Sequence, residues 1–272
     1  SENEYINATS LYHGQEQELM KFRFNIKTDY GFDYSLDYFN VTQYGGNEES
    51  VFERNNSLKS SVVNSLNSSL NFANCTIENS QKINNDQTYA DYGTLLIDSS
   101  SLTMVNCSFV LNEGLALNSN ESTVSISDSY INSKGIKLTS NVDTLSIVNT
   151  QFENCSNYAI DLAGENDHLN ISNSHFSNTS GIYLNTDSTN VYIVNSEFES
   201  QQGNSIEAYG NNVNMLIDST NIYSSSYNGI QMNSYNSTFE MNASIFELNS
   251  GSALEFSGSS IDVDLSNIEF LN

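Results

Sequence analysis

A repeated pattern of about 24 residues constrains the fold of this chain more than any other feature. The segments Leu145–Phe152, Leu169–Phe176 and Val191–Phe198 share the order apolar-x-apolar-x-Asn-small-polar-Phe. The second apolar position recurs at intervals of 21 to 24 residues after a first interval of 32. Its nine occurrences are Phe72, Met104, Ile126, Ile147, Ile171, Ile193, Ile217, Met241 and Leu265.

Two further columns of the repeat are apolar in every rung. The column two residues earlier holds Leu70, Leu102, Val124, Leu145, Leu169, Val191, Met215, Phe239 and Val263. The column five residues later holds Ile77, Phe109, Ile131, Phe152, Phe176, Phe198, Ile222, Phe246 and Phe270. The positions between them are mostly polar, and such period-two alternation predicts short strands with one inward face.

A second short strand follows in most rungs, often after a glycine, as in Gly135-Ile136, Gly181-Ile182 and Gly229-Ile230. Glycine suits a corner that needs positive φ or a close backbone approach. Two or three short strands per 22–24 residues, without a helix, predict an all-β protein. We expect a right-handed parallel β-helix of about nine coils over residues 66–272.

Residues 1–65 do not fit the register and are expected to form an N-terminal cap or β-rich region, with strands at Phe22–Ile26 and Tyr34–Phe39. A loop is expected from Glu78 to Tyr92. At the other end the register runs through Phe270, so we expect an open final coil, either because the chain is a fragment or because this end docks against another molecule.

The column two residues after the second apolar position is rich in asparagine: Asn74, Asn106, Asp128, Asn149, Asn173, Asn195, Ser219, Ala243 and Asn267. Asparagine tolerates the left-handed backbone of a tight turn. We expect a corner where inward amide side chains stack from coil to coil, rather than a metal or sugar site.

The repeats resemble the pectin-lyase-like right-handed β-helices, and most closely the repeats of polymorphic outer membrane proteins, with motifs Phe-x-x-Asn and Gly-Gly-Ala-aliphatic. Phe109–Asn112 and Phe246–Asn249 match the first motif, and Gly251–Leu254 stands in place of the second. Other rungs depart from the motifs, as at Phe152–Asn154 and the single Gly181. The resemblance implies a secreted or surface-displayed protein, with adhesion as the usual role.

The net charge of −25 excludes several classes of partner. Nucleic-acid binding needs clustered Lys and Arg, and after Lys82 only Lys134 and Lys137 occur. An anionic membrane surface would repel the chain, and no apolar run is long enough to span a membrane. We therefore expect neither nucleic-acid binding nor membrane insertion.

Many β-helices degrade polysaccharides, but the residues for that chemistry are not assembled here. A lyase needs a base beside the substrate carboxylate, and no Arg follows Arg54. Of the polygalacturonase motifs only Asn141-Val142-Asp143 occurs. Paired carboxylates such as Glu240 and Asp264 would arise by chance among so many acids, so no catalytic residue is assigned.

The sequence predicts no cofactor and no metal-binding motif. His13, His168 and His175 do not have ligand spacing, and the last two occupy outward columns of one rung. Stacked acids such as Glu240 and Asp264 would hold Ca²⁺ weakly, although a solvated acidic face explains them better.

Cys75 and Cys107 share one column in adjacent rungs, where the other residues are mostly Ser or Thr. Adjacent strands lie about 4.8 Å apart, within the Cα range of a disulfide. The sequence is compatible either with a disulfide between Cys75 and Cys107 or with two buried thiols. Cys155 has no cysteine partner in this column.

The chain contains twelve Asn-x-Ser/Thr sequons. Asn74 and Asn106 belong to the expected inward ladder and should carry no glycan. The remaining candidates for N-linked glycans are Asn7, Asn40, Asn55, Asn67, Asn120, Asn154, Asn170, Asn178, Asn236 and Asn242.

These observations predict a non-enzymatic, structural or adhesive extracellular rod that associates with itself through its coil ends into a filament. The alternative is a carbohydrate-binding or polysaccharide-degrading β-helix, in which outward tyrosines such as Tyr130, Tyr183, Tyr192 and Tyr223 stack on sugars or cell-surface ligands. An ice-binding solenoid would need Thr-x-Thr arrays, which do not repeat from rung to rung.

Overall fold

The computed structural model describes residues 50–53, 63–66, 69–78, 93–110, 115–139 and 143–271, and the structural statements below refer to these residues. The expected strands at Phe22–Ile26 and Tyr34–Phe39 lie outside the described residues, as does nearly all of the expected loop from Glu78 to Tyr92.

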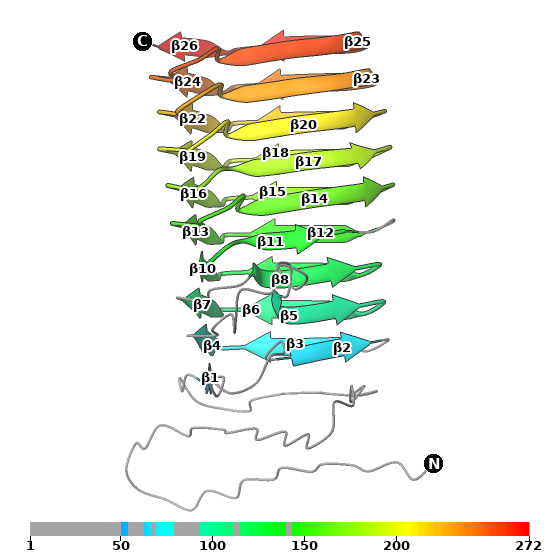
Figure 1. Ribbon diagram of the computed structural model, residues 1–272. Helices are drawn as coiled ribbons and strands as arrows, with labels where there is room; N and C mark the ends of the chain where they lie inside the picture. Colours follow the sequence, from blue (N-terminus) through cyan, green and yellow to red (C-terminus); the bar gives the residue numbers. More distant parts are fainter. Residues whose placement is uncertain are drawn as a thin grey trace, which may run out of the picture.

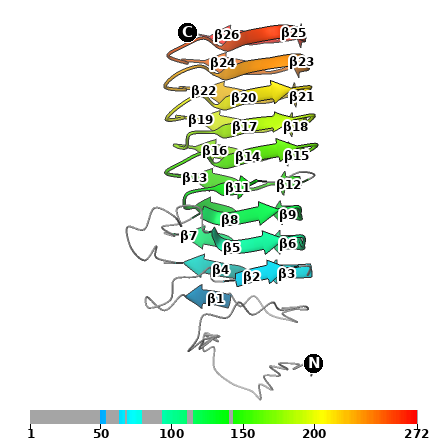
Figure 2. The same cartoon turned by 45° about the vertical axis from the view of Figure 1, so that its right-hand side comes forward.

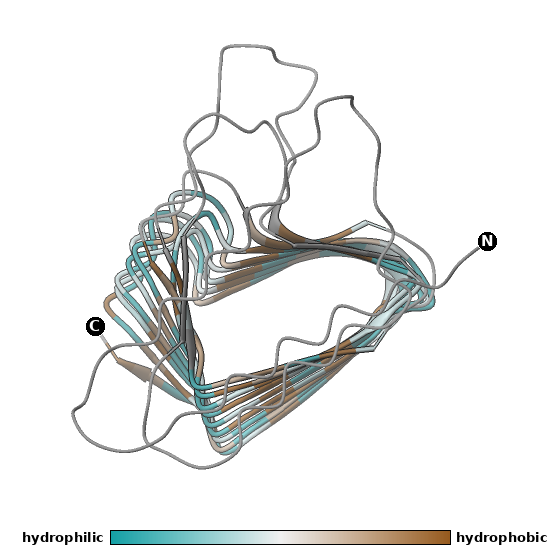
Figure 3. Ribbon diagram, turned by 90° about the horizontal axis from the view of Figure 1, so that it is seen from below, coloured by the Kyte–Doolittle hydropathy of each residue, from teal (hydrophilic) through white to brown (hydrophobic). Residues whose placement is uncertain are grey.

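The described strands wind into a parallel β-solenoid with three walls (Figures 1 and 2). A ten-stranded parallel sheet forms wall 1, and a sixteen-stranded parallel sheet folds round a corner to form walls 2 and 3. A view along the axis shows the three walls superposed from coil to coil (Figure 3). Each coil passes from wall 2 to wall 3 and then to wall 1, and this confirms the fold predicted from the repeat.

Wall 1 consists of β1 (Ser50–Glu53), β4 (Cys75–Glu78), β7 (Ser108–Val110), β10 (Tyr130–Asn132), β13 (Gln151–Glu153), β16 (His175–Ser177), β19 (Glu197–Glu199), β22 (Asn221–Tyr223), β24 (Ile245–Glu247) and β26 (Glu269–Leu271). Wall 2 contains β2 (Val63–Leu66), β5 (Gly93–Asp98), β8 (Leu115–Asn120), β11 (Ile136–Leu138), β14 (Ile160–Glu165), β17 (Ile182–Asp187) and β20 (Ile206–Asn211). Wall 3 contains β3 (Ser69–Ala73), β6 (Ser101–Val105), β9 (Thr123–Ser127), β12 (Thr144–Val148), β15 (His168–Ser172), β18 (Asn190–Val194) and β21 (Asn214–Asp218). The long strands β23 (Ile230–Asn242) and β25 (Leu254–Ser266) run from wall 2 into wall 3.

The three apolar columns predicted from the repeat line the interior in register. On wall 3, Ile147 pairs with Ile126 on one side and Ile171 on the other. On wall 1 the rings of Phe152 and Phe176 stack at 4.8 Å, and those of Phe176 and Phe198 at 4.6 Å. These three rings are fully buried, and burial of such columns supplies most of the driving force for winding.

A column of buried hydroxyls follows at the corner between walls 3 and 1. The backbone N–H of Thr150 donates to Oγ of Ser174, and the N–H of Ser174 donates to Oγ of Ser196. Each hydroxyl in turn donates to the carbonyl two residues before it, as from Ser174 to Ser172 at 2.9 Å. The corner therefore satisfies its buried backbone N–H groups from one coil to the next.

The asparagine column occupies this same corner, but it points outward, so the expected inward ladder is wrong. Asn106, Asn149 and Asn173 are exposed. The backbone at the nine positions has φ between 48 and 54°, as predicted for a left-handed turn. This conformation turns the side chain at these positions to the outside, and from Cys107 to Ser244 it presents the following Cys, Ser or Thr to the interior. Side-chain amides still stack in places, as from Asn106 to Asn74 at 2.7 Å.

The glycines before the strands of wall 2 lie where the backbone has positive φ or is closely approached by another chain segment, as expected. Gly181 has φ +71°, and a Cβ there would lie 2.1 Å from the carbonyl oxygen of Ser205. Gly229 has no positive φ, but a Cβ would lie 2.6 Å from the carbonyl oxygen of Ala253 and 2.7 Å from the ring of Phe246. Both positions therefore need the close approach that only glycine permits.

The winding begins before residue 66, the expected start of the β-helix. β1 pairs in parallel with β4, and β2 pairs with β5, so both strands belong to the solenoid sheets. In the last coil the inward residues are open: Val263, Leu265 and Phe270 are 39, 42 and 57 % exposed. Among the described residues no helix has the length and apolar character needed to cross a membrane.

Candidate functional site

A column of polar residues runs along the outer surface of wall 2. The paired strands β11, β14, β17, β20 and β23 place Lys137, Asp161, Tyr183, Glu207 and Gln231 side by side in this order. Successive members are about 4.8 Å apart because they occupy adjacent strands of one sheet. Nζ of Lys137 lies 3.9 Å from Oδ2 of Asp161, at the end of the column nearer the N-terminus.

Two further tyrosines from outside this column pack beside Tyr183 and form a cluster with it. Tyr158 comes from the loop that leads into β14, and its ring stacks on Tyr183 with a centroid distance of 4.7 Å. Tyr209 lies on β20, one outward position beyond Glu207, and its ring is 5.8 Å from that of Tyr183. We call Tyr158, Tyr183, Tyr209, Glu207 and Asp161 the tyrosine face.

Glu207 is the acceptor on which the tyrosine face converges. The Tyr209 hydroxyl donates to Oε1 of Glu207 at 2.5 Å, and the Tyr158 hydroxyl donates to Oε2 at 3.3 Å. Burial, followed by the charge of Glu207, raises the pKa of Tyr158 to about 12. The hydrogen bond to Glu207 is the largest cause of the raised pKa of Tyr209, whereas burial is the largest for Tyr183. All three hydroxyls therefore keep their protons at neutral pH.

The tyrosine face has the chemistry of a binding surface. It combines aromatic rings with hydroxyl, carboxylate and amide groups, and binding sites for small polar molecules use such combinations. Tyr183 packs between its two neighbours, so the cluster offers ring edges and hydroxyls. Both carboxylate oxygens of Glu207 already accept hydrogen bonds, and Asp161 has Lys137 beside it.

Of the four outward tyrosines singled out in the sequence, only Tyr183 belongs to this cluster. Tyr130 lies on wall 1 and donates to Oε2 of Glu153 at 2.6 Å. Tyr223 is also on wall 1, and Tyr192 is 46 % exposed on wall 3. The column pattern of the sequence did not reveal the other two members of the cluster. Tyr158 lies in a loop, and Tyr209 lies in a neighbouring column.

A pair of buried carboxyl groups was also missed. Asp143 and Asp167 are both fully buried in adjacent coils. Oδ1 of Asp143 accepts the N–H of Ser122, and Oδ1 of Asp167 accepts the N–H of Asp143. The repeat could have revealed this inward column. Asp143 and Asp167 stand four residues before the second apolar position, where Ser100 and Ser122 also occur. Asp143, the acidic residue of the single polygalacturonase-like motif, is therefore not at the surface.

The cysteine column has the register that a disulfide requires. Thr76 pairs with Ser108, so the residues before them, Cys75 and Cys107, are neighbours in adjacent coils. Cys107 is buried, whereas the side chain of Cys75 lies outside the described part, and the disulfide stays a prediction. Burial raises the pKa of Cys155 to about 12.

The candidate glycosylation sites differ in exposure and in the hydrogen bonds that their side-chain amides make. Asn154, Asn170 and Asn236 are exposed. The amides of Asn120, Asn178 and Asn242 donate to Asp98, Asn154 and Asp218. Asn106 is exposed, contrary to the buried position expected for it. Asn7, Asn40, Asn55 and Asn67 lie outside the described residues, and glycan attachment stays a prediction throughout.

The histidines and stacked acids lie at the surface as expected. His168 is exposed on wall 3 and His175 is partly buried on wall 1, whereas His13 lies outside the described residues. Glu240 and Asp264 are adjacent, exposed residues of wall 3, and weak Ca²⁺ binding there stays a prediction.

No protein-family model matches the chain, and no curated protein matches its sequence. Solved structures do resemble it. The surface protein and adhesin PfbA of Streptococcus pneumoniae has a TM-score of 0.51 and 11 % identity, covering 90 % of this chain and 80 % of PfbA. The catalytic unit of a GH87 α-1,3-glucanase from Streptomyces thermodiastaticus has a TM-score of 0.44 and 8 % identity, over 81 % of this chain and 53 % of that one.

At such low identity, the likeness to PfbA concerns the fold alone. Together with the parallel walls and the in-register apolar columns, it shows that the chain has the pectin-lyase-like, right-handed parallel β-helix fold that its repeats predicted.

Proposed function

We propose that this protein is a non-enzymatic, extracellular β-helix that binds carbohydrate through the tyrosine face and so serves an adhesive role at a cell surface. The observation that supports this most is the convergence of Tyr158 and Tyr209 on Glu207 beside Tyr183. A flat wall with a polar group about every 4.8 Å suits an extended ligand that lies along the solenoid axis. PfbA, which has a similar fold, is described as a surface adhesin.

The negative charge of the molecule limits which glycans can bind to it. With a net charge of −25 and no Lys or Arg after Lys137, the surface repels uronate and sulfated polymers. Asp161 and Glu207 would instead accept hydrogen bonds from neutral sugar hydroxyls or from the ammonium groups of amino sugars. The proposed ligand is therefore a neutral or amine-bearing glycan.

Binding of defined oligosaccharides tests this proposal. Calorimetric titrations would compare neutral glucan oligomers, chitosan oligomers and polygalacturonate oligomers. We expect binding of a neutral or amino glycan, with Tyr183→Ala weakening it at least about tenfold, a loss of roughly 1.4 kcal/mol. Tyr192→Ala, at an exposed tyrosine on wall 3, is the matched control and should bind as the wild type does. Equal loss in both variants, or preference for polygalacturonate, would contradict the proposed face.

Turnover separates the binding proposal from the enzymatic alternative. The same glycans would be incubated with the pure protein, and reducing ends or unsaturated products would be measured. Product formation that disappears in Glu207→Gln would replace the non-enzymatic proposal with a glycan-degrading one, because Asp161 and Glu207 stand in one column two strands apart.

End-to-end assembly into a filament also stays a proposal. Val263, Leu265 and Phe270 are exposed in the last described coil, and an exposed parallel edge accepts a further strand. Light scattering over a range of protein concentrations tests it: growth in mass that Phe270→Asp abolishes supports assembly, and a constant monomer mass rejects it.

A further inference from the structure

A second cluster lies on wall 1, separate from the tyrosine face. His175 on β16 pairs in register with Glu197 on β19, and Glu199 follows two residues later on the same outward side. One ligand atom from each of the three residues can be chosen so that all lie within 4.8 Å of one another. A nitrogen and two carboxylate oxygens from adjacent strands thus face a common point.

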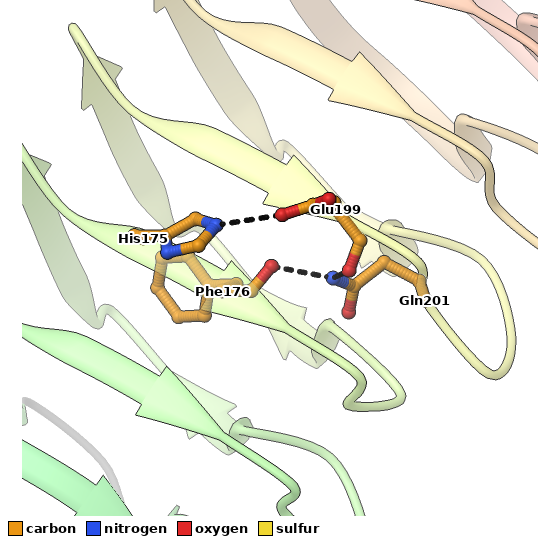
Figure 4. A network of polar contacts seen from close by, with 4 residues as sticks. All are labelled: His175, Phe176, Glu199 and Gln201. Carbon is orange, nitrogen blue, oxygen red and sulfur yellow. Dashed lines mark hydrogen bonds and ion pairs between the residues drawn. The ribbon is translucent and has the colours of Figure 1, made fainter.

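The imidazole of His175 lacks the hydrogen bond that its position invites. Nε2 lies 3.4 Å from Oε2 of Glu199 (Figure 4). This nitrogen is closed to solvent, yet its geometry toward the carboxylate does not make a hydrogen bond. In the tautomer with its lone pair on Nε2, the imidazole presents an acceptor toward the Glu199 carboxylate, and two facing acceptors can share one cation.

The surroundings of the cluster are negative. Glu199 pairs with Tyr223 on the next strand, and Tyr223 pairs in turn with Glu247, so a further carboxylate lies on the same face of wall 1. The other outward residues of β13, β16, β22 and β24 add Glu153 and no Lys or Arg. The carboxylates here therefore have no basic side chain from the neighbouring strands to offset them.

The backbone that carries these ligands is held in place by a buried amide. Gln201 is 1 % exposed, and its Nε2 donates to the carbonyls of Phe176 at 2.7 Å and Glu199 at 2.9 Å (Figure 4). This bridge joins β16 to the end of β19, so the spacing between His175 and Glu199 is fixed from inside the solenoid.

We infer that His175, Glu197 and Glu199 bind one divalent transition-metal ion of the zinc class. Imidazole together with carboxylates suits Zn²⁺, whereas Ca²⁺ takes oxygen ligands alone. Three protein ligands leave a further position for water or an external group. An open groove of about 380 Å³, lined by Asn149, Gln151 and Asn173 among others, reaches the site at His175.

Titration of metal-stripped protein with Zn²⁺ tests the inference. We expect one equivalent to bind, and His175→Gln or Glu199→Gln to weaken that binding at least about tenfold, as loss of a ligand or its support does. The chain has only three histidines, so His168→Gln and His13→Gln complete the set of controls and should bind as the wild type does. Far-UV circular dichroism of each variant confirms that it is folded.

Cobalt(II) provides a second readout that does not depend on affinity alone. Its visible spectrum should show a nitrogen ligand in the wild type and in His168→Gln, and lose it in His175→Gln. No Zn²⁺ binding, or binding unchanged by His175→Gln and Glu199→Gln, would overturn the site. Because wall 1 and wall 2 are probed with different ligands, either proposal can fail without the other.

Discussion

At the scale of the residue, the interior of this β-helix is lined by hydroxyls as well as apolar groups, and its described part also contains the carboxyl groups of Asp143 and Asp167. The column that holds Asp143 and Asp167 contains serine or threonine at Ser100, Ser122 and Thr189. In that column Oγ of Ser122 accepts the backbone N–H of Ser100 at 3.2 Å, so a hydroxyl can do what the carboxylates do.

Asp143→Ala should therefore lower the stability of the protein more than Asp143→Ser does. The serine hydroxyl can still accept the N–H of Ser122, whereas alanine leaves that buried N–H without its acceptor. We expect a difference on the order of 1 kcal/mol in the free energy of unfolding between the two variants, measured by urea denaturation. Asp161→Ser, at a surface position of wall 2, is the control and should have little effect; equal stabilities of Asp143→Ser and Asp143→Ala would contradict the argument.

The tyrosine face should make the protein sensitive to alkali. Its hydroxyls have pKa values above 10, that of Tyr158 being about 12, so the folded state favours the protonated form. The contribution of Tyr158 is complete below pH 10, declines as the pH rises toward 12 and is absent above it. Unfolding free energies at pH 9 and pH 11 should differ less in Tyr158→Phe, which has no proton to lose, than in the wild type.

Cys155 should be unreactive in the folded protein. Its thiol is buried, its pKa is raised to about 12, and thiolate is the reactive form. We expect no labelling of Cys155 by a thiol reagent at pH 8 until denaturant is added, as followed by peptide mass spectrometry. Rapid labelling of the native protein would show that the coil around Cys155 opens locally.

At the scale of the element, each short strand depends on the corner that sets its register. The corner between walls 3 and 1 uses an outward residue with positive φ followed by an inward hydroxyl, and wall 2 begins at a glycine or a close backbone contact. The strands themselves are three to six residues long in most coils, so a displaced corner would move a whole strand out of register.

Gly181→Ala tests the importance of one corner. The added Cβ would meet the carbonyl of Ser205 at 2.1 Å with φ at +71°, so the backbone must move. We expect a loss of roughly 1–3 kcal/mol in unfolding free energy. Gly203→Ala is the matched control, since nothing lies within 4 Å of a Cβ there and its effect should stay within about 0.5 kcal/mol. Similar losses in both variants would contradict the role of the corner.

At the scale of the whole molecule, the winding was predictable because it depends on periodicity alone. Three apolar columns, such as the one containing Phe152, Phe176 and Phe198, fix both register and inward direction. The direction of the Asn column was not predictable from periodicity, because a residue with positive φ interrupts the alternation of faces. Likewise the tyrosine face joins a loop residue to two different columns, and His175 meets Glu199 on a diagonal.

The way the coils are joined has a mechanical consequence. Backbone hydrogen bonds connect each coil only to the next, and they lie along the solenoid axis. Tension applied along that axis would therefore peel off one coil at a time. Each coil of 24 residues would release roughly 80 Å of chain, at about 3.3–3.6 Å per residue, in exchange for about 4.8 Å of height. Under such tension the solenoid would dissipate energy in repeated small unfolding events, which a force-extension trace would record as a sawtooth.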